Sequence, residues 1–210
     1  MYTKAPRLSS DADLRNPVPT AVFLKSAASP ADFPADTGRE VAFVGRSNSG
    51  KSTAVNLIAG ARKLARVSKT PGRTQLINFF TLGESRRLVD LPGYGFARVN
   101  PDVQARWQRL LETYLRERAA LVGLVVTIDI RRGLTQLDEQ LLRWLEPREL
   151  PVAILLTKAD KLSRGAGLAQ RREVAKGLGP TARLTCFSAL TREGVAEARA
   201  WLDGWLGPPS

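Results

Sequence analysis

The sequence predicts a three-layer α/β fold, in which helices cover both faces of a mainly parallel six-stranded sheet with one antiparallel strand at its edge. From residue 39 onward, short apolar runs alternate with segments of helical periodicity, and this alternation is typical of a parallel sheet between two helical layers. Two of the apolar runs are separated only by a tight turn at Gly83-Glu84, which favours an antiparallel hairpin. In such a sheet ligands bind at the carboxyl ends of the strands, so functional motifs are expected there.

The elements follow from the hydrophobic pattern. Apolar runs predict strands at 41–44, 76–82, 87–90, 121–128, 151–156 and 183–187. Helical periodicity predicts helices at 52–59, 103–120, 135–145, 168–177 and 195–206. In the last helix Trp201 and Trp205 lie one helical turn apart and are expected to anchor the core.

The domain organisation is simple. Residues 1–20 are rich in Pro, Ser, Ala and Asp, and are predicted to form a flexible N-terminal extension. A single domain is expected over 21–207, with a short ordered piece at its start, Ala21-Val22-Phe23-Leu24. No apolar run approaches the length of a membrane-spanning helix, and no secretory signal is evident at the N-terminus.

Composition excludes several kinds of chemistry. Among 210 residues there is no histidine, so no histidine base or metal ligand is available. The one cysteine, Cys186, excludes an internal disulfide and favours a reducing, cytoplasmic setting. The formal net charge of +12 favours polyanionic partners such as nucleic acid, although a generally Arg-rich composition is an equal alternative. Arg62, Lys63 and Arg66 exceed what a nucleotide needs and are candidates to face RNA.

The strongest motif is Gly45-Arg46-Ser47-Asn48-Ser49-Gly50-Lys51-Ser52, which matches the phosphate-binding loop G-x-x-x-x-G-K-[ST]. It follows an apolar strand and precedes a helix, as this loop requires. Glycines let the backbone wrap around phosphates, and the helix N-terminus favours negative charge. Lys51 is expected to contact the outer phosphates, and the Ser52 hydroxyl to bind Mg²⁺.

Two further motifs follow apolar strands. Asp90-Leu91-Pro92-Gly93 places a carboxylate where it holds Mg²⁺ through water, and a glycine N–H near a γ-phosphate. Thr157-Lys158-Ala159-Asp160 places a carboxylate that accepts hydrogen bonds from N1–H and the amino group of guanine, a donor pair that adenine lacks. The sequence therefore predicts a site for GTP rather than ATP.

Weaker motifs complete the expected site. Ser188-Ala189-Leu190 follows the last strand, and a backbone N–H there is expected to meet guanine O6. The segment 68–74 contains Pro71 and Gly72 and is predicted to be a loop. Thr74 is the expected Mg²⁺ ligand of this loop when a γ-phosphate is bound, with Thr70 as the alternative, so the loop is predicted to order with GTP and to be released after hydrolysis.

With these motifs in order, the chain resembles the EngB (YihA/YsxC) ribosome-biogenesis GTP-binding proteins, which belong to the TRAFAC class of P-loop GTPases. The resemblance rests on GRSNSGKS, PGRTQLINFF, DLPGYGFA, TKAD and SAL, and runs from about Phe23 to the last helix. It implies a Ras-like fold and binding of GTP or GDP and Mg²⁺. It also implies a role in assembling the large ribosomal subunit, an association with normal division and septation, and the precursor of that subunit as partner. Separately, we expect a monomeric protein.

The resemblance also implies the contact residues by position. The nucleotide is expected to contact Gly45, Arg46, Ser47, Asn48, Ser49, Gly50, Lys51, Ser52, Gly72, Arg73, Thr74, Gln75, Leu76, Asp90, Leu91, Pro92, Gly93, Thr157, Lys158, Ala159, Asp160, Phe187, Ser188, Ala189 and Leu190. The first switch is Gly72 to Leu76, and the segment Phe187 to Leu190 closes over the base. Mg²⁺ is expected on Ser52 and Thr74.

Catalysis is expected to depend on Lys51, Asn48 and Gly93. Tyr94 stands where Ras-type enzymes carry a water-orienting Gln, so intrinsic hydrolysis is predicted to be slow. Asn48 stands where related GTPases place K⁺ near the phosphates, which makes K⁺ a candidate cofactor. Arg73 as an internal arginine finger is a weaker alternative.

Other functions remain alternatives. One is a different RNA-associated TRAFAC GTPase of the Era type. Another is a P-loop phosphotransferase, although no Arg-rich lid insertion is evident in the sequence. A membrane-surface switch lacks a lipidation signal or an evident amphipathic anchor, so no membrane partner is expected.

Overall fold

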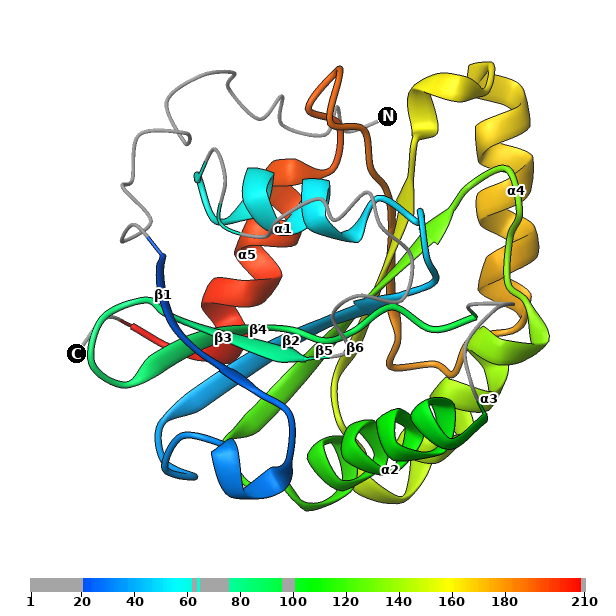
Figure 1. Cartoon of the computed structure of the whole chain (residues 1–210). Coiled ribbons are helices and arrows are strands. Elements are labelled where there is room, and N and C mark those ends of the chain that lie inside the picture. The colour runs from blue at the N-terminus through cyan, green and yellow to red at the C-terminus, as the bar shows by residue number, and fades with distance from the viewer. Residues whose placement is uncertain (1–20, 62–63, 65–75, 96–100, 209–210) are drawn as a thin grey trace.

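The structure, a computed structural model, describes residues 21–61, 64, 76–95 and 101–208. Its centre is a seven-stranded sheet in the order β1-β3-β4-β2-β5-β6-β7 (Figure 1). The strands are β1 (Val22–Ala27), β2 (Arg39–Gly45), β3 (Ile77–Thr81), β4 (Arg86–Asp90), β5 (Leu121–Asp129), β6 (Val152–Thr157) and β7 (Arg183–Cys186). Strands β4, β2, β5, β6 and β7 are parallel, and β3 runs antiparallel to both of its neighbours.

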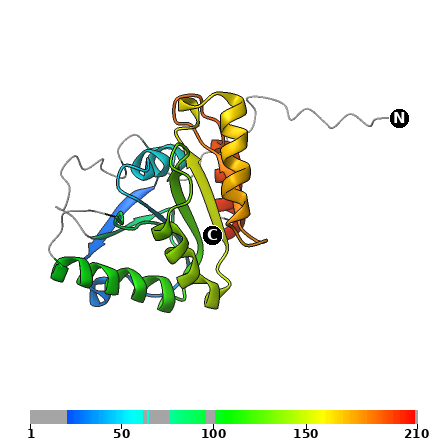
Figure 2. The same ribbon diagram turned by 90° about the vertical axis from the view of Figure 1, so that its right-hand side faces the viewer.

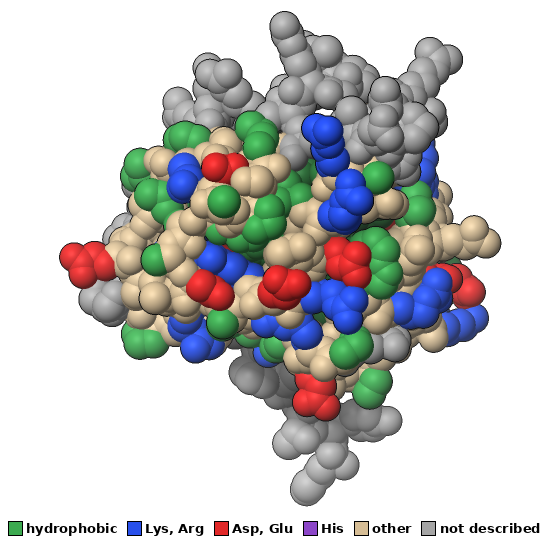
Figure 3. Space-filling view, turned by 60° about the horizontal axis from the view of Figure 1, so that its bottom comes forward, with side chains coloured by type: hydrophobic (Ala, Val, Ile, Leu, Met, Phe, Trp, Pro, Cys, Tyr) green, Lys and Arg blue, Asp and Glu red, His purple; other side chains and the backbone are tan. Residues whose placement is uncertain are grey.

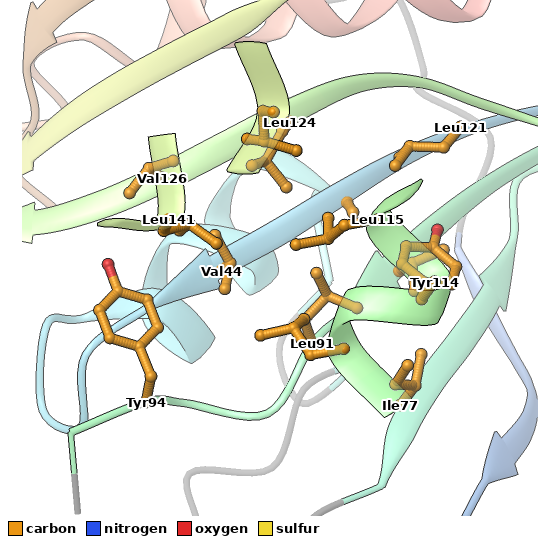
Figure 4. Close-up of a cluster of buried hydrophobic side chains, with 14 of the residues drawn as sticks. Val44, Ile77, Leu91, Tyr94, Tyr114, Leu115, Leu121, Leu124, Val126 and Leu141 are labelled. Atoms are coloured by element: carbon orange, nitrogen blue, oxygen red, sulfur yellow. The ribbon is translucent and has the colours of Figure 1, made fainter. Parts of the chain in front are cut away.

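Helices cover both faces, because alternate residues of each strand point to opposite sides. On one face α1 (Lys51–Ile58) and α5 (Val195–Leu206) pack in a cluster with Val41 and Phe43 of β2. On the other, α2 (Pro101–Glu117) and α3 (Gln136–Leu145) pack in a cluster with Ala42 and Val44, and α4 (Arg164–Lys176) joins it through Val174. Figure 4 shows side chains of this second cluster around Val44. Short 3₁₀ turns lie at Pro30–Asp32 (η2), Glu146–Arg148 (η3) and Ala159–Lys161 (η4).

The α/β fold class is confirmed, with one more strand than the six expected. The added strand is β1, which forms the sheet edge and pairs antiparallel with β3. Its first three side chains, Val22, Phe23 and Leu24, are all exposed. The strand therefore shows none of the alternation between buried apolar and exposed polar residues that marks a strand in a sequence. The predicted hairpin of β3 and β4 is confirmed.

Helix α4 begins earlier than the predicted residue 168. The hydroxyl of Ser163 accepts a hydrogen bond from Ala166 N (3.4 Å) and caps the helix at Arg164. Gly165 and Gly167 count against a helix in sequence reasoning, since glycine is a poor helix former. The structure nevertheless places both in the helix, with Gly167 buried against Ile130.

Trp205 is buried, as expected of a core anchor, whereas Trp201 is only partly buried. The Trp205 ring lies over Gly123 of β5, where a Cβ atom would be 2.4 Å from Cε3 of the indole. This glycine therefore lets α5 approach the sheet closely.

A buried ion cluster fixes the end of β2 that lies opposite the phosphate-binding loop. The Glu40 carboxylate is fully buried and accepts hydrogen bonds from Arg87 Nε (2.7 Å), Arg118 Nη2 (2.7 Å) and Tyr114 OH (2.9 Å). The Arg118 guanidinium also donates to the carbonyl of Pro34 (2.8 Å). A carboxylate with this many donors is fully compensated, so the cluster joins α2 to the sheet.

Within the described ranges, no helix has the length and apolar composition needed to cross a membrane. The expected flexible extension, residues 1–20, lies outside the described residues, as do Arg62, Lys63 and Arg66.

Candidate nucleotide site

The loop from Gly45 to Lys51 connects the end of β2 to the start of α1. Gly50 is the N-cap of α1 with φ +88°, a left-handed conformation that glycine adopts without strain. Asn48 is also left-handed, at φ +64°, and asparagine tolerates this region better than most residues. At Gly45 a Cβ atom would lie 2.1 Å from Thr127 Oγ1, so no larger residue fits. The backbone thus takes the curled path that the motif predicts, ending at a helix N-terminus.

Two threonines fasten this loop to the sheet. The hydroxyls of Ser49 and Thr127 are hydrogen-bonded at 2.7 Å, and Thr127 Oγ1 also donates to Val44 O (3.2 Å). Thr157 Oγ1 lies within hydrogen-bond distance of two carbonyls, Ser49 O and Ile128 O. Sequence reasoning assigned Thr157 to the base-reading motif and did not assign Thr127. The sequence did contain a signal for Thr127, since a hydroxyl residue stands there in an otherwise apolar predicted strand.

Lys51 and Asp90 form an ion pair between Lys51 Nζ and Asp90 Oδ1, and both side chains are about nine-tenths buried. Lys51 begins α1, and Asp90 is the last residue of β4. The structure therefore brings together the cation expected at the outer phosphates and the carboxylate expected near Mg²⁺.

The segment after Asp90 runs alongside the phosphate-binding loop. Tyr94 N donates to Gly45 O (3.2 Å), and Ser47 N donates to Tyr94 O (3.1 Å), which makes a short parallel bridge. A Cβ atom on Gly93 would lie 3.3 Å from Gly45 O, so Gly93 permits this close approach. The two motifs form one continuous backbone surface.

The Tyr94 side chain is buried and extends to α3, where its hydroxyl donates to Asp138 Oδ1 (Figure 4 shows Tyr94 in the cluster that includes Leu141). The other oxygen of Asp138 accepts hydrogen bonds from Thr135 N (2.8 Å) and Thr135 Oγ1 (2.7 Å) at the start of α3. Burial, and then the nearby Asp138 carboxylate, raise the pKa of the Tyr94 phenol well above its usual value. The phenol is therefore neutral, and its hydroxyl is hydrogen-bonded to α3. This agrees with the expectation that Tyr94 does not orient a water as a Gln would.

Lys158 links the base-reading motif to the phosphate-binding loop. Its Nζ donates to Asn48 O (2.7 Å) and to Asp129 Oδ2 (2.9 Å). Asp129 also binds the Arg131 guanidinium, and the hydrogen bond from Arg131, with that from Lys158, holds the pKa of the Asp129 carboxyl below its ordinary value. Asp129 ends β5 and was not among the predicted site residues.

Asp160 and Ser188 join the two loops that are expected to surround guanine. Ser188 Oγ donates to Asp160 Oδ1 (2.8 Å) and accepts a hydrogen bond from Leu190 N (3.2 Å), while Ala159 N donates to Phe187 O (3.1 Å). The hydrogen bond from Ser188 lowers the pKa of the Asp160 carboxyl, so this group is ionised at neutral pH. An ionised carboxylate is the acceptor that a guanine N–H pair requires.

Not every predicted residue offers a side chain to this site. Phe187 begins the segment that was expected to close over the base. Its ring is buried in the core cluster with α1 and α5, so only its backbone is available to the site. Leu76 is half-buried just before β3. Gly72, Arg73, Thr74 and Gln75, the rest of the first switch, lie outside the described residues, as does Thr70.

The donors suit a hard divalent cation. Ser52 lies in the first turn of α1, next to Lys51 and its partner Asp90. Hydroxyl and carboxylate oxygens are the ligands Mg²⁺ prefers. A cavity of about 220 Å³ adjoins the phosphate-binding loop, and its lining includes Arg46, Ser47, Asn48 and Ser49 of the loop and Lys158 of the base-reading motif. Its lining contains none of Lys51, Asp90, Asp160 and Ser188, so the cavity includes only part of the predicted site.

Comparison with known proteins agrees with these motifs. Residues 40–158 match the family model described as 50S ribosome-binding GTPase. A probable GTP-binding protein EngB of Azoarcus sp. (strain BH72) is 50% identical over 192 residues, covering 90% of this chain and 92% of the relative. The protein of the same name from Nitrosococcus oceani is 51% identical over 190 residues, covering 89% and 95%.

Solved structures share the fold. A crystal structure of a probable GTP-binding protein engB aligns with a TM-score of 0.66 at 21% identity, covering 80% of this chain and 98% of that one. A variant of Aquifex aeolicus Era, bound to GDP.AlF4-, aligns with a TM-score of 0.65 at 22% identity, covering 83% and 58%. The family match, the relatives at half identity over most of their length and the assembled motifs lead to one conclusion: the chain belongs to the EngB family of GTP-binding proteins and is a GTPase.

Proposed function

We propose that this GTPase is a nucleotide-dependent switch in assembly of the large ribosomal subunit, and that normal cell division and septation depend on it. The proposal is supported by the family description, 50S ribosome-binding GTPase, together with the net charge of +12. A role in ribosome assembly places the protein in the cytoplasm, acting as a monomer on the precursor of the large subunit.

In this proposal guanine binds beside Asp160, and the phosphates follow the backbone from Gly45 to Ser52. The ion pair of Lys51 with Asp90 is exchanged for contacts of Lys51 with the phosphates. Ser52 and Thr74 would hold Mg²⁺ with the help of the Asp90 carboxylate, and the ion would supply positive charge beside the phosphates. The N–H of Gly93 senses the γ-phosphate, because the Asp90–Gly93 segment already runs along the loop.

Hydrolysis is proposed to be slow without a partner. The Tyr94 hydroxyl is held by Asp138 on α3, so it does not orient an attacking water. A slow enzyme of this kind remains in its GTP state long enough to act as a timer, and docking on the pre-ribosomal particle is where acceleration is expected.

The test is depletion of the protein followed by sedimentation of ribosomal particles. Depletion is expected to reduce the large subunit and to accumulate its precursor, and re-expression of the wild-type chain to reverse this. Re-expression of Asp160→Asn, which alters the base-reading carboxylate, is expected to fail. A normal large-subunit profile after depletion would contradict the proposed pathway, although not GTP binding. A small-subunit defect would favour the Era-type alternative.

A further inference from the structure

We propose that the outer face of α4 is the surface that docks on ribosomal RNA, by contacts with the phosphate backbone. This inference rests on the proposed function and adds the element that makes the contact. Arg164, Arg172 and Lys176 define the face, which we call the α4 basic face. With Leu168 they lie at successive four-residue steps, about 6 Å apart along the axis, and so share one side of the helix. All four side chains are exposed, while Gly167 and Val174 point inward.

The charge of this face is little compensated within the protein. The only acid in α4 is Glu173, whose carboxylate pairs with Lys176 (2.6 Å). Within the described ranges, neither Arg164 nor Arg172 has a carboxylate partner. Uncompensated arginines at regular spacing match a polyanion, because a phosphate backbone presents negative charge at regular intervals.

The helices α2, α3 and α5 each carry at least two acids, whereas α4 carries one, although Arg106 and Arg109 of α2 are also exposed. On α2 the Arg116 guanidinium pairs with Glu112 (2.9 Å), and on α3 Arg143 pairs with Glu139 (3.9 Å). Figure 3 turns the underside of Figure 1 forward, the side on which α2 lies, and there basic and acidic side chains are interspersed. Helix α4 lies at the outer border of the molecule (Figures 1 and 2).

The first turn of α4 departs from what helix stability favours. It contains no acid and begins with Arg164, although the positive end of a helix favours negative side chains. Gly165 follows, and a Cβ atom there would meet nothing within 4 Å, so packing among the described residues does not require glycine. Residues that lower the stability of a helix without improving its packing are expected where the surface has a function. Here they leave backbone N–H groups and arginines open to an approaching phosphate.

The face favours RNA over a lipid surface. A membrane-bound helix needs an apolar side to insert below the headgroups. On the α4 basic face Leu168 is the only large apolar side chain. The face also directly follows the loop that carries Asp160, so RNA docking and guanine binding act on adjacent segments.

The test compares two variants of equal charge. The first reverses the face, with Arg164→Glu, Arg172→Glu and Lys176→Glu. The control reverses three exposed cations of α2 and α3, with Arg106→Glu, Arg109→Glu and Arg143→Glu. Each reversal lowers the charge by two, so both variants carry +6 in place of +12. A Glu at position 164 suits a helix N-terminus, whereas a Glu at position 176 loses the ion pair with Glu173 at the C-terminal end, so the helix content of the variant is measured. Circular dichroism and GDP affinity confirm that both variants fold.

Binding to deproteinised large-subunit ribosomal RNA is measured over a series of KCl concentrations. The α4 variant is expected to bind at least about tenfold more weakly, with a salt dependence reduced by about two to three ions, and the control within about twofold of the wild type. Equal weakening in both variants, or none in the α4 variant, would overturn the proposal. Binding to vesicles of anionic phospholipid is measured in parallel. An α4 variant that loses only vesicle binding, and still binds the RNA, would also overturn the proposal. None of these results would change the outcome of the depletion experiment, which tests the proposed function separately.

Discussion

Tyr94 shows how the position of one side chain limits the chemistry of the site. It directly follows the segment that is proposed to sense the γ-phosphate, yet its hydroxyl donates to Asp138 on α3. Loss of this donor would leave one oxygen of the buried Asp138 unsatisfied, which costs about 1 to 3 kcal/mol. Sequence reasoning found that Tyr94 is not a Gln, but the packing partner depends on tertiary structure.

Tyr94→Phe is therefore expected to lower the free energy of unfolding by about 1 to 3 kcal/mol while leaving GTP turnover nearly unchanged. Urea denaturation and a single-turnover hydrolysis assay measure the two effects. Tyr94→Ala serves as the comparison, since it also removes the ring from the core and should cost more. A large loss of turnover with unchanged stability would show that the hydroxyl acts in catalysis.

Asn48 is the residue for which a cation requirement is predicted. Its side chain is exposed, while its backbone is left-handed and its carbonyl binds Lys158. If Asn48 helps hold K⁺ beside the phosphates, GTP turnover should be faster in KCl than in NaCl at equal ionic strength, by about tenfold or more. Asn48→Ala should remove the difference between the salts. Equal rates in the two salts for the wild type would contradict the idea.

Among the elements, the phosphate-binding loop and α4 each contain a glycine, but in different surroundings: Gly45 is tightly packed and Gly165 is not. A Cβ atom at Gly45 would clash with Thr127 in the sheet, whereas at Gly165 it would meet open space. Gly45→Ala is expected to abolish nucleotide binding or prevent folding, because the clash involves the backbone carbonyl of Thr127 as well as its hydroxyl. Gly165→Ala is expected to stabilise the protein by about 0.5 to 1 kcal/mol, the usual gain in a helix.

Thermal denaturation and GDP titration of these two variants compare the same chemical change in two environments. A Gly45→Ala variant with wild-type affinity would contradict the described geometry of the loop. A destabilised Gly165→Ala variant would contradict the exposed position of Gly165.

The sequence predicted those elements whose local pattern agrees with the fold. The β2 strand, the glycine-rich loop and the hairpin of β3 and β4 combine clear apolar runs with defined turn residues. Strand β1 and the first turn of α4 were not predicted. The exposed apolar residues of β1 do not follow a strand pattern, and the glycines of α4 do not follow a helix pattern. In the site, sequence motifs named Lys51, Asp90 and Asp160. Thr127, Asp129 and Asp138 became apparent only through contacts between distant segments.

For the molecule as a whole, two buried phenols couple stability to alkaline pH. Burial, and the neighbouring carboxylates of Asp138 and Glu40, raise the pKa of Tyr94 and Tyr114 above the ordinary value of about 10. A group whose pKa is raised by folding contributes stability that is present below its unfolded pKa and is lost as pH rises above it. The free energy of unfolding is therefore expected to fall as pH rises above about 10.

Chemical denaturation across this pH range, with phenolate absorbance followed in parallel, measures the effect. The Tyr114→Phe variant should show a weaker decline, since one of the two linked groups is gone, though from a lower starting stability because Tyr114 also donates to Glu40. Stability that is flat from about pH 9 to the end of the tyrosine titration would contradict the burial of these phenols.

The central claim is that the whole domain assembles a guanine-specific site. In it the Asp160 carboxylate accepts a hydrogen bond from Ser188, and the neighbouring Lys158 donates to Asn48 O of the phosphate-binding loop. The most direct measurement is the affinity of the wild type and of Asp160→Asn for GDP and for xanthosine diphosphate. Asp203→Asn, which changes an exposed carboxylate of α5, is the control. The wild type and the control should prefer GDP, and Asp160→Asn should prefer the xanthosine nucleotide, a reversal of at least about tenfold. An unchanged preference for GDP in Asp160→Asn would contradict the account.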